Sequence, residues 1–120
     1  MKKLVLGLVL LGLPVAAFSV SLECEKCISE DIPLAECYGD EYDRQDKRLN
    51  VAYKAAIKSN NMDVKLLKQK QRDWIKLRDK SCPEPNEDTR SASDYARWQY
   101  CLADKTEVRA VELEQIARFK

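Results

Sequence analysis

The chain has 120 residues, which is enough for one domain and too short for a deep cleft between two domains. Its 21 basic and 20 acidic side chains give a net charge of +1, so strong overall attraction to nucleic acid or to anionic lipid is not expected. Histidine is absent, which removes the most common general base, and we therefore expect a binding protein and not an enzyme.

The first 21 residues have the layout of a secretory signal peptide. Lys2 and Lys3 precede the apolar run Leu4–Leu13, and the small residues after Pro14 fit cleavage between positions 17 and 21. The run is shorter than the roughly 18 apolar residues that a membrane span needs. Loss of the two lysines leaves 19 basic and 20 acidic side chains, a net charge of −1. We predict a periplasmic or secreted domain over residues 22–120, with no stable membrane insertion after cleavage.

The first predicted helix starts near Pro33, with Asp31 as a candidate cap and the proline in the first turn, where its missing N–H does no harm. Apolar and aromatic residues then recur at helical spacing. The predicted inner stripe consists of Leu34, Tyr38, Tyr42, Leu49, Tyr53, Ala56 and Ile57. The turn Ser59-Asn60-Asn61 ends this helix, and Asn61 or Asp63 can cap the next one.

Two further helices are predicted, from about Asp63 to Lys80 and from roughly Asp94 to Phe119. The second helix has Leu67, Gln71, Trp74 and Arg78 along one face, and Leu66, Ile75 and Leu77 widen its apolar side. The third has Trp98, Leu102, Arg109, Leu113 and Ile116 on its inner stripe. We interpret the two tryptophans as core residues, with an exposed binding role as the alternative. With hardly any strand-like alternation, the sequence predicts an all-α fold, a small three-helix bundle.

Five cysteines in an exported domain of this size predict disulfides. Cys82 follows the second helix and Cys101 lies early in the third, so a bridge between them would close the loop that contains Pro83 and Pro85. Cys37 would then pair with Cys24 or Cys27, and we favour Cys24. The pair Cys24 and Cys27 lacks the strand-to-helix context of a redox motif, and a four-thiolate zinc site would use nearly every cysteine. We therefore expect no metal and no cofactor.

Several polar side chains share helix faces with large apolar ones, which places them partly between the helices. These residues are Asp46, Asn50, Gln71, Arg78 and Arg109. Buried polar groups need partners, and a guanidinium can hold a carboxylate through two parallel hydrogen bonds. We predict that Arg78 and Arg109 find carboxylates or helix carbonyls, with Asp46 as the leading candidate. The alternative is that the five residues form a ligand pocket.

Three ordered groups of residues extend this pattern along the chain. They are Cys37, Asp46-Lys47-Arg48-Leu49-Asn50 and Tyr53; Gln71-Arg72-Asp73-Trp74-Ile75, Arg78-Asp79 and Cys82; and Cys101-Leu102, Thr106, Arg109 and Glu112-Leu113. Together they resemble the LprI-like lysozyme-inhibitor family of exported bacterial domains, over about Cys24 to Glu114. The resemblance implies a helical, disulfide-bonded periplasmic or secreted domain and, for the branch that gave the family its name, inhibition of lysozyme.

The partner that this resemblance implies is a protein, with lysozyme or another peptidoglycan hydrolase as the named class. Two acidic patches are candidate contact surfaces for the basic rim of such an enzyme. They are Asp40, Glu41 and Asp43, and Glu84, Glu87 and Asp88. One alternative is an envelope adaptor or immunity protein that does not inhibit lysozyme. Another is a small enzyme that uses two carboxyl groups about 5 to 9.5 Å apart on wall fragments.

Overall fold

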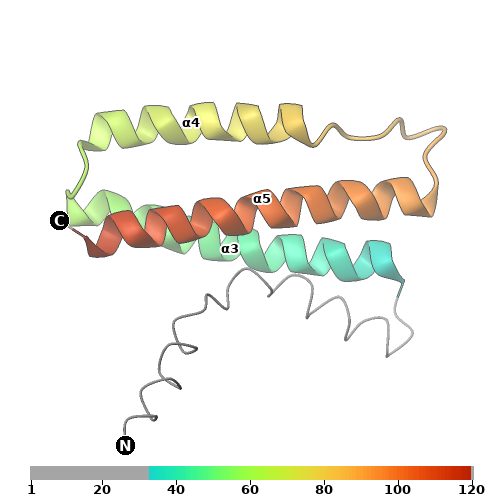
Figure 1. Ribbon diagram of the computed structural model, residues 1–120, viewed down its shortest axis with the longest axis horizontal. Coiled ribbons are helices and arrows are strands. Elements are labelled where there is room, and N and C mark those ends of the chain that lie inside the picture. Colours follow the sequence, from blue (N-terminus) through green and yellow to red (C-terminus); the bar gives the residue numbers. More distant parts are fainter. Residues whose placement is uncertain (1–32, 120) are drawn as a thin grey trace, which may run out of the picture.

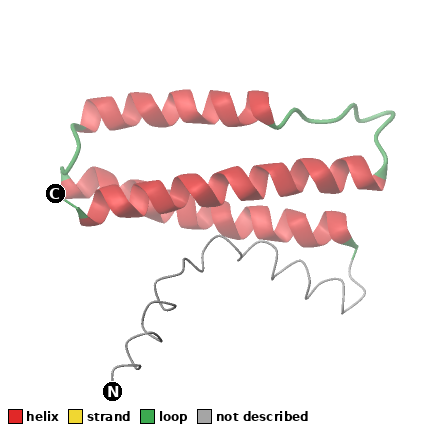
Figure 2. Cartoon of the chain, in the orientation of Figure 1, coloured by secondary structure: helices red, strands yellow, loops and turns green. Residues whose placement is uncertain are grey.

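The computed structural model describes residues 33–119, which form three helices (Figure 1). They are α3, Leu34–Ser59; α4, Val64–Ser81; and α5, Ala92–Arg118. Figure 2 shows only helices and loops in this described part of the chain, so the prediction of an all-α, three-helix fold is confirmed. None of the three helices combines the length and apolar character that crossing a membrane requires. The predicted signal peptide, Asp31, Cys24 and Cys27 lie outside the described residues.

The start of each helix can be traced to one or two residues, through the backbone for α3 and through capping side chains for α4 and α5. Pro33 lies at the N-cap of α3, one residue before the helix, and its carbonyl accepts a hydrogen bond from the Cys37 N–H. Asp63 caps α4 by accepting from the Leu66 N–H at 3.0 Å, as one of the two predicted alternatives had it. Ser91 and Asp94 form a reciprocal capping box at the start of α5.

The turn between α3 and α4 is tied to the end of α5. Asn60 adopts a left-handed conformation, with φ of 57°, directly after the last residue of α3. The side-chain amide of Asn61 donates to the carbonyl oxygens of Ile116 and Ala117 at 2.8 and 3.2 Å. These bonds satisfy carbonyl groups in the last turn of α5, which have no partner inside the helix.

Helices α3 and α5 pack closely side by side over most of their length (Figure 1). Alanines occupy much of their contact surface, and because this side chain is short, the two helix backbones can approach closely. The buried alanines are Ala52 and Ala56 on α3 and Ala96, Ala103 and Ala110 on α5. Leu49 and Leu113 complete the cluster between them, and Leu67 reaches it from α4.

Helix α4 lies as a separate layer beside this pair (Figure 1), and only Leu67 and Gln71 on it are buried. Trp74 is partly buried against the core, and Trp98 is partly buried near the end of α4. Leu66, Ile75 and Leu77, which widen the apolar side of α4, are 48, 40 and 62% exposed, so this wider apolar side is not buried. A helix that has neighbouring helices on just one side buries a narrow stripe of its surface.

The disulfide predicted between Cys82 and Cys101 is present, with 5.7 Å between the two Cα atoms. It joins the C-cap of α4 to the third turn of α5. Cys37 is completely buried and is also disulfide-bonded. Its partner lies outside the described residues, so the choice between Cys24 and Cys27 stays a prediction.

Candidate functional site in the loop between α4 and α5

The loop of residues 82–91, here called the α4–α5 loop, projects at one end of the molecule (Figure 1). Its first residue is fixed twice. The disulfide to Cys101 anchors Cys82 covalently, and the indole N–H of Trp98 donates to the Cys82 carbonyl at 3.1 Å. The base of the loop is therefore held against α5 by one covalent bond and one hydrogen bond.

The interior of the loop is ordered by its own hydrogen bonds. The Asn86 carbonyl accepts from the Thr89 and Arg90 N–H groups at 3.2 and 2.9 Å, and the Asn86 side chain accepts from the Asp88 N–H at 2.8 Å. Two prolines, Pro83 and Pro85, further restrict the backbone. Such a loop loses little conformational entropy when it binds a partner, which is the physical advantage of a preorganised contact surface.

Arg90 ties the loop to α5 from the other side. Its guanidinium lies 3.7 Å from the Glu84 carboxylate and 4.7 Å from the centre of the Tyr95 ring. Tyr95 in turn makes an edge-to-face contact with Trp98. These contacts connect both ends of the loop to one aromatic pair on α5.

The tip of the loop is acidic. Glu84, Glu87 and Asp88 are all exposed, as predicted, and Glu84 is the member that Arg90 partly neutralises. Glu87 and Asp88 form no ion pair with any described residue. A depression of about 310 Å³ at the base of the loop is lined by Pro83, Pro85 and Trp98, and also by Asp94 and Arg97 of α5. The loop therefore offers two carboxylates without an ion-pair partner among the described residues, and a partly apolar hollow at its base.

The second predicted acidic patch is incomplete. Asp40 and Asp43 are exposed, but the prediction for Glu41 is wrong, because this residue is only 1% exposed. The Glu41 carboxylate accepts from Arg44 and from the Gln45 amide, each at 2.8 Å. Its burial follows from helical spacing, since Glu41 lies one turn after the buried Cys37 and cannot meet a partner protein.

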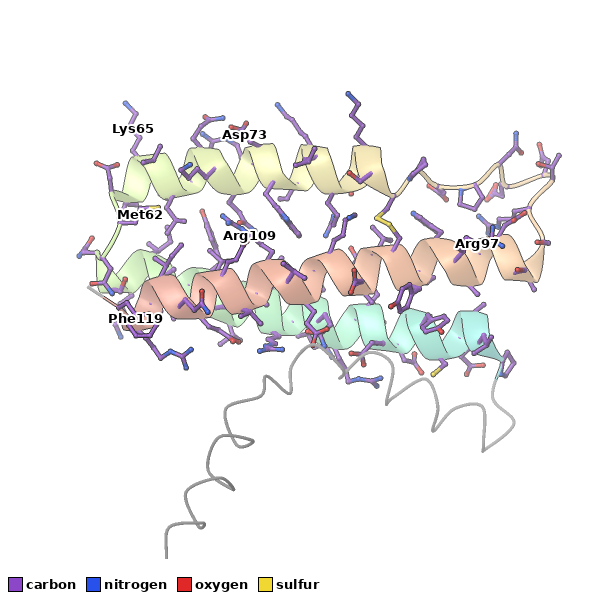
Figure 3. The ribbon with its side chains drawn as sticks, in the orientation of Figure 1. Met62, Lys65, Asp73, Arg97, Arg109 and Phe119 are labelled. Atoms are coloured by element: carbon purple, nitrogen blue, oxygen red, sulfur yellow. A yellow bond between two sulfur atoms is a disulfide. The ribbon has the colours of Figure 1, made fainter. Side chains whose placement is uncertain are left out.

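The predicted polar network divides into two parts. Gln71 accepts from Arg109 at 2.9 Å, and Arg109 also pairs with Glu112 at 3.1 Å. Figure 3 shows Arg109 reaching from α5 toward α4. Arg109 therefore finds its predicted carboxylate in Glu112 on its own helix, and its contact with α4 is the side-chain amide of Gln71.

The second part of the network centres on Arg78. Its guanidinium pairs with Asp79, donates to the Thr106 hydroxyl at 3.4 Å and lies over the rings of Trp74 and Tyr42. Burial raises the pKa of the Tyr42 hydroxyl, and the Arg78 charge acts in the opposite direction. The prediction that Asp46 is the carboxylate for Arg78 or Arg109 is therefore wrong.

Asp46 and Asn50 nevertheless share a surface with the other members. Together with Gln71 and Arg78 they line a groove of about 320 Å³ between α3 and α4. Asp46 is half-buried and Asn50 is exposed. Arg78 reaches α3 at the Tyr42 ring but takes its carboxylate from Asp79, its neighbour on α4, so Asp46 lines the groove without pairing with it.

One ion pair had no signal in the sequence. Arg48 on α3 donates twice to the Glu114 carboxylate on α5, at 2.7 and 2.9 Å, and lies 3.8 Å from the buried Glu107. These hydrogen bonds lower the pKa of Glu114 and raise the pKa of Arg48. The pair links residues 66 positions apart and fixes the two close-packed helices in register.

Comparison with known proteins identifies a family. Residues 24–113 match the model of the family described as lysozyme inhibitor LprI. One similar protein is the uncharacterized protein YecT of Escherichia coli (strain K12), which is 31% identical over 98 residues. The match covers 68% of this chain and about 60% of the length of that relative. No solved structure matches the chain.

Proposed function

Because the chain belongs to the LprI lysozyme-inhibitor family, we propose that it binds and inhibits a lysozyme-type peptidoglycan hydrolase in the periplasm or outside the cell. The proposed contact surface is the α4–α5 loop. The observation that carries this choice is the combination of a covalently fixed loop base with the exposed, unpaired carboxylates of Glu87 and Asp88.

The chemistry of the loop fits a basic enzyme rim. Opposite charges speed the encounter of two proteins and fix their orientation, and rigid loops pay a small entropic cost on binding. The apolar hollow beside Pro83 and Trp98 can receive one apolar side chain of the partner, as interface centres commonly do. The protein acts by covering the substrate groove of the enzyme and performs no chemistry itself.

The direct test is a lysozyme assay on cell-wall substrate with the purified, disulfide-bonded protein at molar excess. We expect inhibition that falls at high salt, because exposed charges are screened. The variant Glu84→Gln/Glu87→Gln/Asp88→Asn is expected to raise the inhibition constant at least tenfold. Its matched control is Glu36→Gln/Asp40→Asn/Asp43→Asn, which removes three exposed carboxylates from α3 and is expected to inhibit normally.

Two outcomes would contradict the proposal in different ways. Undiminished lysozyme turnover at molar excess of the protein would contradict inhibition, and an adaptor or immunity role in the envelope would then be the better hypothesis. Inhibition that is lost equally in both triple variants would contradict the loop as the contact surface. In that case the overall negative charge, and not the loop, would guide the encounter.

A further inference from the structure

The near-neutral charge of the whole chain conceals a strongly cationic helix. Within its 18 residues α4 carries seven basic and two acidic side chains, a net charge of +5. Because the whole chain has a net charge of +1, the remaining residues together carry −4. A charge averaged over the chain therefore says little about what this helix attracts.

Most of the positive charge on α4 is exposed, and it outnumbers the one carboxylate, Asp73, that Figure 3 labels on the same outer side of the helix. Six of its basic side chains are exposed, and none of the six forms an ion pair with a described residue. They are Lys65, Lys68, Lys70, Arg72, Lys76 and Lys80. Only Arg78 turns toward the neighbouring helices, where it already neutralises Asp79.

The cations are arranged along one outer line, here called the α4 cationic row. Its members are Lys65, Arg72, Lys76 and Lys80, which recur at helical spacing opposite the buried Leu67 and Gln71. At 1.5 Å per residue the row is about 22 Å long. Figure 3 shows Lys65 projecting from α4 away from α5. A straight row on the outer layer of the molecule fits a flat anionic surface better than a concave pocket.

Two exposed leucines accompany the row. Leu66 and Leu77 are 48 and 62% exposed, and their spacing of eleven residues, close to three helical turns, places both on one flank. Helices that lie on anionic bilayers combine basic side chains with exposed leucines. The lysines contact lipid phosphates, and the leucines reach the boundary between the headgroups and the acyl chains.

We propose that α4 docks peripherally on an anionic phospholipid surface through the α4 cationic row, with Leu66 and Leu77 at the headgroup boundary. We favour a bilayer as the binding partner because it presents a plane of phosphates to the whole α4 cationic row. The acidic α4–α5 loop lies beyond the C-terminal end of α4. This binding activity is separate from hydrolase inhibition and does not depend on it.

The experiment measures co-sedimentation of the protein, expressed with its own N-terminal segment and purified with its disulfides intact, with two kinds of lipid vesicle. One contains phosphatidylcholine alone, and the other contains phosphatidylglycerol as about a third of the lipid. We expect binding to the anionic vesicles only, and its loss when salt rises from about 50 to about 500 mM. Each lysine near the surface is worth about fivefold in partitioning. The variant Lys65→Glu/Lys76→Glu/Lys80→Glu is therefore expected to bind at least tenfold more weakly.

The matched control is Lys47→Glu/Lys54→Glu/Lys58→Glu, which makes the same charge change at exposed positions of α3. It is expected to retain binding within about threefold, and circular dichroism verifies that both variants fold. Equal loss in the two variants would overturn a local site on α4. Binding to the neutral vesicles as strong as to the anionic ones would overturn a role of the α4 cationic row, because an apolar segment would then carry the association. Binding to soluble polyphosphate without binding to anionic vesicles would replace the bilayer by a polyanion.

Discussion

The interface between α3 and α5 differs in its packing from the interface between α4 and this pair. Between α3 and α5, alanines allow close backbone contact, and Leu49 and Leu113 fill the space that remains. Between α4 and this pair, backbone contact is sparse, and long side chains such as Trp74, Arg78 and Arg109 span the distance. The first interface is close-packed and also encloses polar groups such as Glu107 and the Arg48–Glu114 ion pair. The second combines one buried leucine with hydrogen bonds and ring contacts across a wider gap.

This difference explains why the disulfide lies where it does. Helix α4 buries only Leu67 and Gln71, so apolar burial contributes little to its attachment. The Cys82–Cys101 bridge holds the end of α4 that lies farthest from the short connection to α3. A covalent link therefore supports the helix that packing supports least.

The largest expected effect is a loss of core packing on α5. Leu113 is completely buried, so Leu113→Ala is expected to lower the free energy of unfolding by about 2 to 5 kcal/mol, from lost burial and the cavity left behind. The matched change on the outer flank of α4, Leu77→Ala, is expected to cost less than about 0.5 kcal/mol. Denaturant unfolding measures both. Similar costs at the two positions would show that α4 buries more of its apolar side than its exposure indicates.

The next effect concerns the covalent support of α4. The double variant Cys82→Ala/Cys101→Ala is expected to lose about 3 kcal/mol of stability, because a loop of about 20 residues is no longer closed in the unfolded chain. The loss is expected to be uneven. Amide hydrogen exchange, followed residue by residue, is expected to accelerate more in α4 than in α3 or α5. Uniform acceleration in all three helices would mean that the bundle opens as one unit, and would contradict the weaker attachment of α4.

The same contrast sets how far the sequence could predict the structure. Helix positions follow from local signals, and the ends predicted from Asp63 and the Ser59-Asn60-Asn61 turn lie within one residue of those observed. The bridge between Cys82 and Cys101 was predictable because one cysteine directly follows α4 and the other lies early in α5, on either side of the same loop. Local chemistry was therefore sufficient for the fold class and for the base of the candidate site.

Features that depend on the distance between helices could not be predicted in this way. The pairing of Asp46 with Arg78 depended on how α3 and α4 are placed side by side, and no pattern within a single helix reports that placement. The burial of Glu41 did have a signal, because Cys37, Glu41, Gln45 and Leu49 recur every fourth residue. A charged residue in the middle of such a series indicates a buried carboxylate with partners on its own helix.

The smallest expected effect tests the ion pair that joins the two close-packed helices. Hydrogen bonds from Arg48 lower the pKa of Glu114 in the folded protein, so the ionised carboxylate adds stability above the pKa of an unfolded glutamate, near 4.3. That contribution is lost as pH falls through the lower, folded-state pKa. Both side chains are about one third exposed, so solvent screening limits the effect of Glu114→Gln at pH 7 to about 0.5 to 1 kcal/mol. The difference in unfolding free energy between the wild-type protein and Glu114→Gln should shrink as pH falls from 7 to 3. The control is Glu36→Gln, which makes the same change at an exposed position. A difference independent of pH would mean that the carboxylate acts through packing and not through its charge.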